Sequence, residues 1–196
     1  MKKILLPVIT MLASLASTNA SAQSDWSIGL FHANQEYSKR NNFETVGVRV
    51  GYQFTEHFSL EARLAKGTSG YSSYHPSISA DLGEDINWQR GLFAKASYPL
   101  SENLNIYALA GYSSTRLDVS SYIMRYDQNN VLIEEGPYYY KKDNKGFSYG
   151  AGLNYQITER FSLFAEHQVL PDYDFEVTGK ANKNWQSLNV GVNYHF

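Results

Sequence analysis

The chain has 196 residues, no cysteine, a formal net charge of −2 and a mean hydropathy of −0.42. Its long apolar stretch is confined to about the first twenty residues, which excludes a membrane-spanning helix in the rest of the chain, and the lack of cysteine excludes disulfides. Aromatic residues make up 15% of the chain, and most apolar residues alternate with polar ones. This period of two indicates an all-β chain.

The first segment has the order of regions found in a secretory signal peptide. Met1–Lys3 is basic, Ile4–Leu15 is apolar, and Ala20-Ser21-Ala22 supplies the small residues that signal peptidase accepts. We therefore expect residues 1–22 to be a signal peptide cleaved after Ala22, and residues 23–196 to form one domain. The mature net charge is then about −4, and without a basic patch we expect no nucleic-acid partner.

A nine-residue pattern occurs three times and predicts three tight turns. The copies begin at Tyr52, Tyr98 and Tyr155, and each carries a Thr-Glu or Ser-Glu pair between two alternating segments. The copies are 46 and 57 residues apart. These unequal spacings are typical of hairpins with tight turns at one end and variable loops at the other. The three turns join six strands, and one strand at each end of the domain brings the total to eight.

The predicted strands form an up-and-down barrel. In chain order they are Trp26–Gln35, Thr45–Phe54, Phe58–Lys66, Asn87–Leu100, Leu104–Leu117, Gly146–Ile157, Phe161–Val169 and Trp185–Phe196. One face of these strands is apolar, and the other is rich in Gly and Ser. Because strands seldom carry Gly unless space is short, we expect the Gly-rich face to line a narrow interior and the apolar face to contact lipid. A soluble lipocalin-like barrel, with the apolar face inside, is the alternative.

Aromatic residues near both ends of the apolar face are candidate membrane girdles. They are Tyr52, Phe54, Phe58, Tyr98, Tyr155, Phe161 and Tyr194 on the turn side, and Trp88, Tyr112 and Phe147 on the loop side.

The last eight residues carry a terminal pattern: Asn189, then Gly191, then the aromatic residues Tyr194 and Phe196. This segment resembles the carboxy-terminal assembly signal of bacterial outer-membrane barrels. In size and pattern the whole mature chain resembles the small eight-stranded barrels, such as the OmpX/Ail group and the transmembrane domain of OmpA. The resemblance implies an integral outer-membrane location, contact with outer-membrane lipids and lipopolysaccharide, and recognition of these four residues by the barrel-assembly machinery. Alternatively, Tyr194 and Phe196 are girdle residues.

Five charged residues fall on the predicted interior face, three to five residues from the turns. They are Arg49, Glu61, Arg63, Lys95 and Glu166. Five residues in a tilted strand rise about 13 Å, so we expect these charges to form one layer near the middle of the barrel. Buried charges persist when they are paired, which predicts a salt-bridge network that plugs the interior. A path for ions or small solutes is the alternative.

Three long outer loops are expected over Gly67–Ile86, Asp118–Lys145 and Leu170–Asn184, and they carry half of the tyrosines. These candidate surface contacts are Tyr71, Tyr74, Tyr122, Tyr126, Tyr138, Tyr139, Tyr140 and Tyr173. Alternation on both sides of Asp127–Asn130 predicts a β-hairpin that projects beyond the membrane. Such an edge can bind an extracellular protein or host ligand by strand addition, which suggests adhesion or shielding. Alternatively, the tyrosines and charged residues have no binding role and merely suit strands that lie among the sugars of lipopolysaccharide.

An enzyme is the less favoured hypothesis. His75 and Ser77, with Glu84 nearby, faintly resemble the His-x-Ser pair of outer-membrane lipid A deacylases, but the intervening Pro76 and the loop setting argue against it. The five histidines have no metal-ligand spacing. We therefore expect a monomer without catalysis, cofactor or metal.

Overall fold

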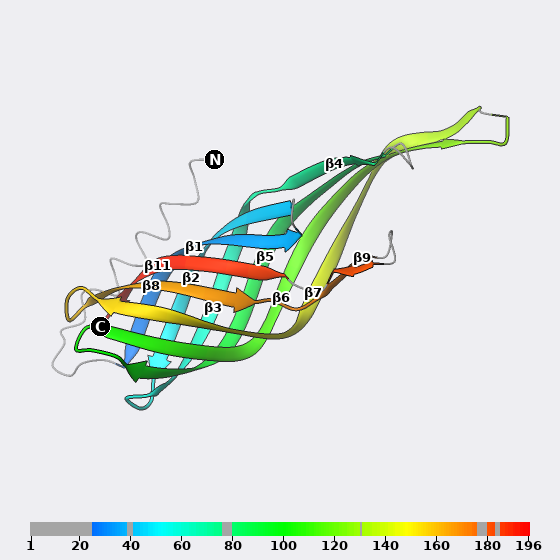
Figure 1. The fold of residues 1–196 in the computed structure, drawn as a ribbon. Helices are drawn as coiled ribbons and strands as arrows, with labels where there is room; N and C mark the ends of the chain where they lie inside the picture. The colour runs from blue at the N-terminus through cyan, green and yellow to red at the C-terminus, as the bar shows by residue number, and fades with distance from the viewer. Residues whose placement is uncertain (1–24, 39–40, 76–79, 130, 176–179, 183–184) are drawn as a thin grey trace.

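The computed structural model describes residues 25–38, 41–75, 80–129, 131–175, 180–182 and 185–196, so the predicted signal peptide lies outside the described residues. Eight antiparallel strands of the described chain form a closed barrel (Figure 1). They are β1 (Trp26–Ser38), β2 (Asn41–Gln53), β3 (Phe58–Ser69), β5 (Ala80–Pro99), β6 (Leu104–Tyr126), β7 (Leu132–Gln156), β8 (Phe161–Val169) and β11 (Gln186–His195). Within the described ranges, no helix is long and apolar enough to cross a membrane.

Strands that are consecutive in the sequence of the eight are neighbours in the barrel, and the first and last of them, β1 and β11, also pair with each other. The sheet order is β3-β2-β1-β11-β8-β7-β6-β5, and pairing of β3 with β5 closes the ring. The short strand β4 (Tyr71–His75) pairs with the outer part of β5, and β9 (Tyr173–Phe175) pairs with β10 (Lys180–Asn182) as a separate ribbon. The predicted eight-stranded up-and-down barrel is confirmed.

The three repeated turns lie at one end of the barrel, where the chain also ends (Figure 1). In the first, the Phe54 amide donates to the Phe58 carbonyl at 3.1 Å, and the Thr55 hydroxyl accepts from the Phe58 amide at 3.0 Å. The third turn repeats this pattern with Thr158 and Phe161. The Thr side chain therefore closes the turn, which explains why the same residue type recurs there.

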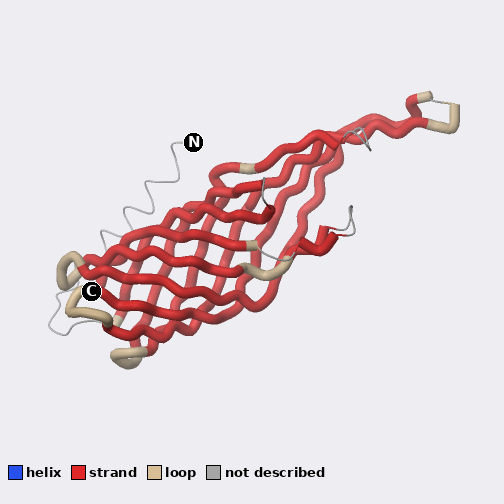
Figure 2. Tube along the Cα trace, in the orientation of Figure 1, coloured by secondary structure: helices blue, strands red, loops and turns tan. Residues whose placement is uncertain are grey.

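At the other end, the strands are longer than predicted. β5 begins at Ala80 instead of Asn87, β6 ends at Tyr126 instead of Leu117, and β7 begins at Leu132 instead of Gly146. The predicted loop boundaries were therefore wrong, because cross-strand hydrogen bonds continue through these polar segments. Strand covers most of the outer region in Figure 2.

The projecting hairpin is confirmed. β6 and β7 stay paired out to Tyr126 and Leu132, and the Asp127 carboxylate accepts hydrogen bonds from the Asn129 and Val131 amides, each at 2.8 Å. β5 pairs with β6 only as far as Tyr122, so the end of the hairpin extends alone (Figure 1).

The apolar face points outward. Val46, Leu64 and Leu92 are exposed by 46%, 55% and 59%, whereas Ser148 and Ser162 on the polar face are fully buried. Because the soluble alternative requires the reverse, that alternative is wrong.

A break in register between Ile86 and Trp88 reverses the alternation of β5. Before the break, Glu84 and Ile86 are buried; after it, Phe93 and Lys95 are on the inward face and Trp88 on the outward face. A β-bulge has this effect because one extra residue shifts the side-chain phase.

Candidate functional site

The structure joins all five predicted interior charges in one network. The Arg63 guanidinium donates to Glu61 at 2.6 Å and bidentately to Glu166 at 2.6 and 2.7 Å. Glu61 also lies 3.4 Å from Arg49 and 3.8 Å from Lys95. Both carboxylates are at most 5% exposed, so the network is buried.

The Arg63–Glu166 pair crosses the lumen. Arg63 lies on β3 and Glu166 on β8, and three barrel strands separate β3 from β8 in either direction around the ring. These strands are therefore opposite each other. Tyr107 and Asn189 also donate to the Glu166 carboxylate, at 3.0 and 2.9 Å, so its oxygens are well satisfied in the interior.

Four aromatic side chains that the sequence analysis did not place inside fill the space around these charges. The Arg49 guanidinium lies 3.3 Å from the centre of the Phe164 ring. The Arg63 guanidinium lies 4.9 Å from the centre of the Phe93 ring and 6.0 Å from the centre of the Phe31 ring. The Lys95 amine lies 4.4 Å from the centre of the Tyr107 ring. Cation–π contacts of this kind stabilise buried cations.

Glycines on the inward face leave room for these rings. Gly47 lies directly opposite Phe31, and Gly152 directly opposite Tyr107. A Cβ atom at Gly47 would lie 2.5 Å from the Phe31 ring, and one at Gly152 would lie 2.7 Å from the Tyr107 ring. A glycine opposite an aromatic residue was the available sequence signal for rings in the interior.

The amount of free space in the lumen changes along the length of the barrel. A cavity of about 650 Å³ at the turn end is lined by Arg49, Glu61 and Lys95, among others. On the far side of the network, the space beside Arg63 and Phe93 is only about 10 Å³. Gln35 then donates to Gln89 at 2.9 Å, and Gln89 donates to Thr115 at 2.8 Å.

An apolar cluster fills the mouth at the hairpin end. Its members are Phe43, Ile86, Leu117, Val119, Leu170 and Trp185, each at most 3% exposed. Together with the charge network, this cluster leaves the lumen occupied at two levels.

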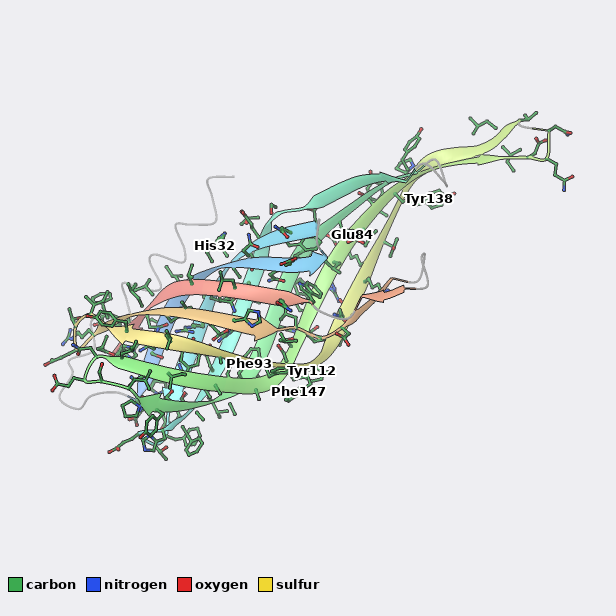
Figure 3. All side chains as sticks on the ribbon, in the orientation of Figure 1. His32, Glu84, Phe93, Tyr112, Tyr138 and Phe147 are labelled. Carbon is green, nitrogen blue, oxygen red and sulfur yellow. The ribbon has the colours of Figure 1, made fainter. Side chains whose placement is uncertain are left out.

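Glu84 is a buried carboxyl at the mouth (Figure 3). It is 4% exposed, lies directly opposite Val119 and two residues from Ile86, and its Oε1 has no hydrogen-bond partner in the described part of the chain. Burial raises the pKa of Glu84 to about 7, and the positive charge of Lys142 opposes this shift.

Replacing Glu84 should change how the stability of the barrel depends on pH. The unfolded carboxyl loses its proton near pH 4.5 but the folded one near pH 7, so wild-type stability is full below about 4.5 and falls as the pH rises to about 7. Glu84→Gln should remove this loss and be more stable than wild type by about 1–3 kcal/mol at pH 8. Urea unfolding at pH 5 and pH 8 measures the difference. A variant that follows the wild-type pH profile contradicts the expectation.

The predicted surface tyrosines lie on extended strands instead of loops. Tyr71 and Tyr74 are on β4, Tyr122 and Tyr126 on β6, and Tyr173 on the β9–β10 ribbon. The remaining three are consecutive on β7: Tyr138, Tyr139 and Tyr140, exposed by 40%, 78% and 46%. Seven of the eight therefore lie on β4, β6 and β7 of one sheet, in which β5 separates β4 from β6, while Tyr173 lies on the separate ribbon.

One edge of the projecting hairpin has no strand partner among the described residues. β7 pairs with β6 from Leu132 onward, but its pairing with β8 begins only at Tyr149. Asn144 and Ser148 donate from their side chains to the carbonyls of Pro171 and Val169, so the chain after β8 covers the lower part of this edge. Among the described strands, none pairs with β7 at residues 132–143 on this side.

The four assembly-signal residues have structural contacts of their own. Asn189 donates to Glu166 and Gln168 inside the lumen, and Gly191 lies directly opposite Phe164. The Tyr194 ring packs against Phe161 and Phe196 with ring centres 5.2 and 5.1 Å apart. These contacts explain why Asn, Gly, Tyr and Phe occur at the four positions. Recognition of these residues by the assembly machinery stays a prediction.

The described residues do not form a catalytic site that would support the enzyme hypothesis. The side chains of His75 and Ser77 lie outside the described residues. Within the described ranges, no group of three or more His, Cys, Asp or Glu side chains could hold a metal. His32 lies on the barrel exterior, 3.8 Å from Glu44 (Figure 3).

Comparison with known proteins places this geometry among bacterial outer-membrane barrels. The sequence profile of the outer membrane protein beta-barrel domain matches residues 6–196. Similar solved structures include OprG of Pseudomonas aeruginosa (TM-score 0.54, 12% identity, 89% of this chain and 97% of that chain), Ail of Yersinia pestis (0.53, 13%, 90% and 100%) and the neisserial surface protein NspA (0.53, 18%, 90% and 100%). At these identities the likeness establishes the fold alone. No curated protein matches the sequence.

Proposed function

We propose that this chain, which belongs to the outer membrane protein beta-barrel domain family, has a non-enzymatic role in surface interaction. In this role the lumen is closed, and the β6–β7 hairpin binds a partner outside the cell by strand addition. The observation that carries this proposal is the Tyr-rich stretch of β7 at residues 132–143, which pairs with β6 and with no other described strand. Adhesion and shielding are the two surface roles that such an edge serves.

The hairpin has the reach and the chemistry for contact with another protein. From Arg116, which pairs with Trp88, to Tyr126, β6 runs ten more residues and so extends about 30 Å beyond that level. Unpaired backbone groups on a strand edge bind an extended segment of another chain, and tyrosine adds contact area at a low cost in side-chain entropy.

The contents of the lumen support a closed barrel. A bidentate ion pair crosses the interior, and an apolar cluster fills the mouth above it. An eight-stranded barrel is only wide enough for its own side chains. The large cavity at the turn end is therefore a vestibule open to one side and not part of a continuous channel.

Removal of the hairpin tip tests the surface role. In one variant a two-residue Asn-Gly turn replaces residues 124–135 and joins Ile123 to Gly136, which are paired across the hairpin. In a second, Tyr138, Tyr139 and Tyr140 become Ser; in a matched control they become Phe. Adhesion of expressing bacteria to epithelial cell layers should fall several-fold in the first two and persist in the Phe control. Equal adhesion by wild type and both test variants, at equal surface levels, contradicts the proposal.

The absence of catalysis has its own test. Lipid A from bacteria that express the protein should have the same mass spectrum as lipid A from bacteria that lack it. Loss of an acyl chain in the expressing strain would favour the enzyme hypothesis instead.

A further inference from the structure

The vestibule at the turn end of the lumen has a cationic floor and an acidic rim. Arg49 and Lys95 line the inner end of this cavity of about 650 Å³, and Glu61 is the carboxylate beside them. The rim is formed by four exposed carboxylates in or next to the turns, which also line the cavity: Asp25, Glu56, Glu102 and Glu159. An ion that enters from the turn end therefore passes these acids before it reaches the cations.

The charge network behind this floor carries more positive than negative charge. Its three cations are Arg49, Arg63 and Lys95. Its two carboxylates are Glu61 and Glu166, so three positive charges against two negative ones leave an excess of one positive charge. Arg63 lies 2.6 Å from each carboxylate, whereas Arg49 and Lys95 lie 3.4 and 3.8 Å from the one at Glu61. Because the two less closely paired cations line the vestibule, the excess charge lies on its floor.

Arg49 has an unused hydrogen-bond donor at this floor. The residue is 3% exposed, and its Nε donates to Asn193 at 2.7 Å, but its Nη1 has no hydrogen-bond partner in the described part of the chain. A buried charged donor without an acceptor costs free energy. Arg49 Nη1 and Lys95 Nζ both lie near Glu61 Oε2, so these nitrogens are no more than about 7 Å apart, the sum of their distances to that oxygen. One small anion between them can contact both.

We propose that the floor of the vestibule binds a small monovalent anion, a carboxylate or a halide, between Arg49 and Lys95. The anion balances the excess charge of the network, accepts a hydrogen bond from Arg49 Nη1 and lies beside the Lys95 ammonium group. A single negative charge matches the excess, and the acidic rim repels a multivalent anion more strongly than a monovalent one. The site is independent of the hairpin and needs no continuous channel, because the anion enters and leaves at the turn end.

Broadening of the chloride nuclear magnetic resonance signal by the purified full-length barrel in a neutral detergent tests this site. At about pH 6, where Lys and Arg are charged, the wild-type protein should broaden the signal in a saturable way. Lys95→Met removes the excess charge and one contact, and it should weaken chloride binding about tenfold or more. Arg160→Gln is the matched control, because it removes the same charge from the third turn at a residue that does not line the vestibule. It should change chloride binding less than about twofold.

A second variant keeps both cations and supplies the anion from within. Ser97 lines the vestibule two residues from Lys95 on the same face of β5, so Ser97→Asp places a carboxylate beside the site and should also weaken chloride binding about tenfold. Chloride binding by both test variants as tight as that of wild type, or an equal loss in Arg160→Gln, overturns the site.

Competition with the wild-type protein identifies the anion and does not depend on a variant folding. Acetate should displace chloride, and sulfate at the same ionic strength should displace it less well. Displacement by acetate at a concentration below that of chloride supports the site and assigns it to carboxylates, and displacement only above that concentration supports it and assigns it to halides. Sulfate that displaces chloride at a lower concentration than acetate overturns the assignment to a monovalent anion.

Discussion

Arg63→Met should lower the free energy of unfolding of the barrel by about 3–5 kcal/mol. The substitution leaves Glu166 without its bidentate partner and Glu61 with only the longer contacts to Arg49 and Lys95. Both carboxylates are buried, so water replaces the lost guanidinium poorly. Urea unfolding in lipid vesicles, followed by tryptophan fluorescence, measures the loss.

Two further variants isolate the cause. Arg63→Met combined with Glu166→Leu removes both members of the ion pair, and it should be more stable than Arg63→Met alone because no unpaired carboxylate remains on β8. Arg116→Met breaks an ion pair on the outer surface and should change stability far less. If the double variant is less stable than the single one, desolvated charge is not the reason for the loss.

Deletion of Phe196 should lower the amount of barrel in the outer membrane several-fold while leaving its stability nearly unchanged. If this residue belongs to the assembly signal, the deletion acts before folding is complete. In the folded barrel the ring contacts Tyr194, and loss of one aromatic pair costs about 0.5–1.5 kcal/mol. Quantitative immunoblotting of outer membranes and refolding of the purified protein into detergent separate the two effects.

Phe161→Ala is the matched control. Phe161 also packs on the Tyr194 ring, at a similar centre-to-centre distance, but lies outside the terminal segment. It should cost similar stability and leave the membrane yield near that of wild type. Equal yields for the two variants would mean that Phe196 acts only as a girdle residue.

The fold could be predicted because its signals are local. Strand alternation and the three copies of the turn depend on residues close in sequence, and Thr55 and Thr158 close their turns with their own side chains. The interior charges could be located for the same reason, since counting from a turn fixes both the face and the height of a residue such as Arg63 or Glu166.

The structural features that could not be predicted from the sequence depend on contacts between residues that are distant in the sequence. The length of the hairpin is set by hydrogen bonds between β6 and β7, which polar residues form as well as apolar ones. The bulge beside Trp88 inverts the faces of β5 and cannot be seen in the alternation of that strand alone. Phe31 was not assigned to the interior from its residue type, and Gly47 across the strand pair provides the space that its ring fills inside.

Single-channel recording of the full-length protein in planar bilayers tests the closed lumen most directly. With the Arg63–Glu166 pair across the interior and the apolar cluster at the mouth, the wild-type protein should show no sustained open state at either sign of applied voltage. Arg63→Met with Glu166→Leu keeps side chains in the lumen and should also stay closed. A reproducible large open state of the wild-type barrel would contradict the closed lumen and favour a solute pore.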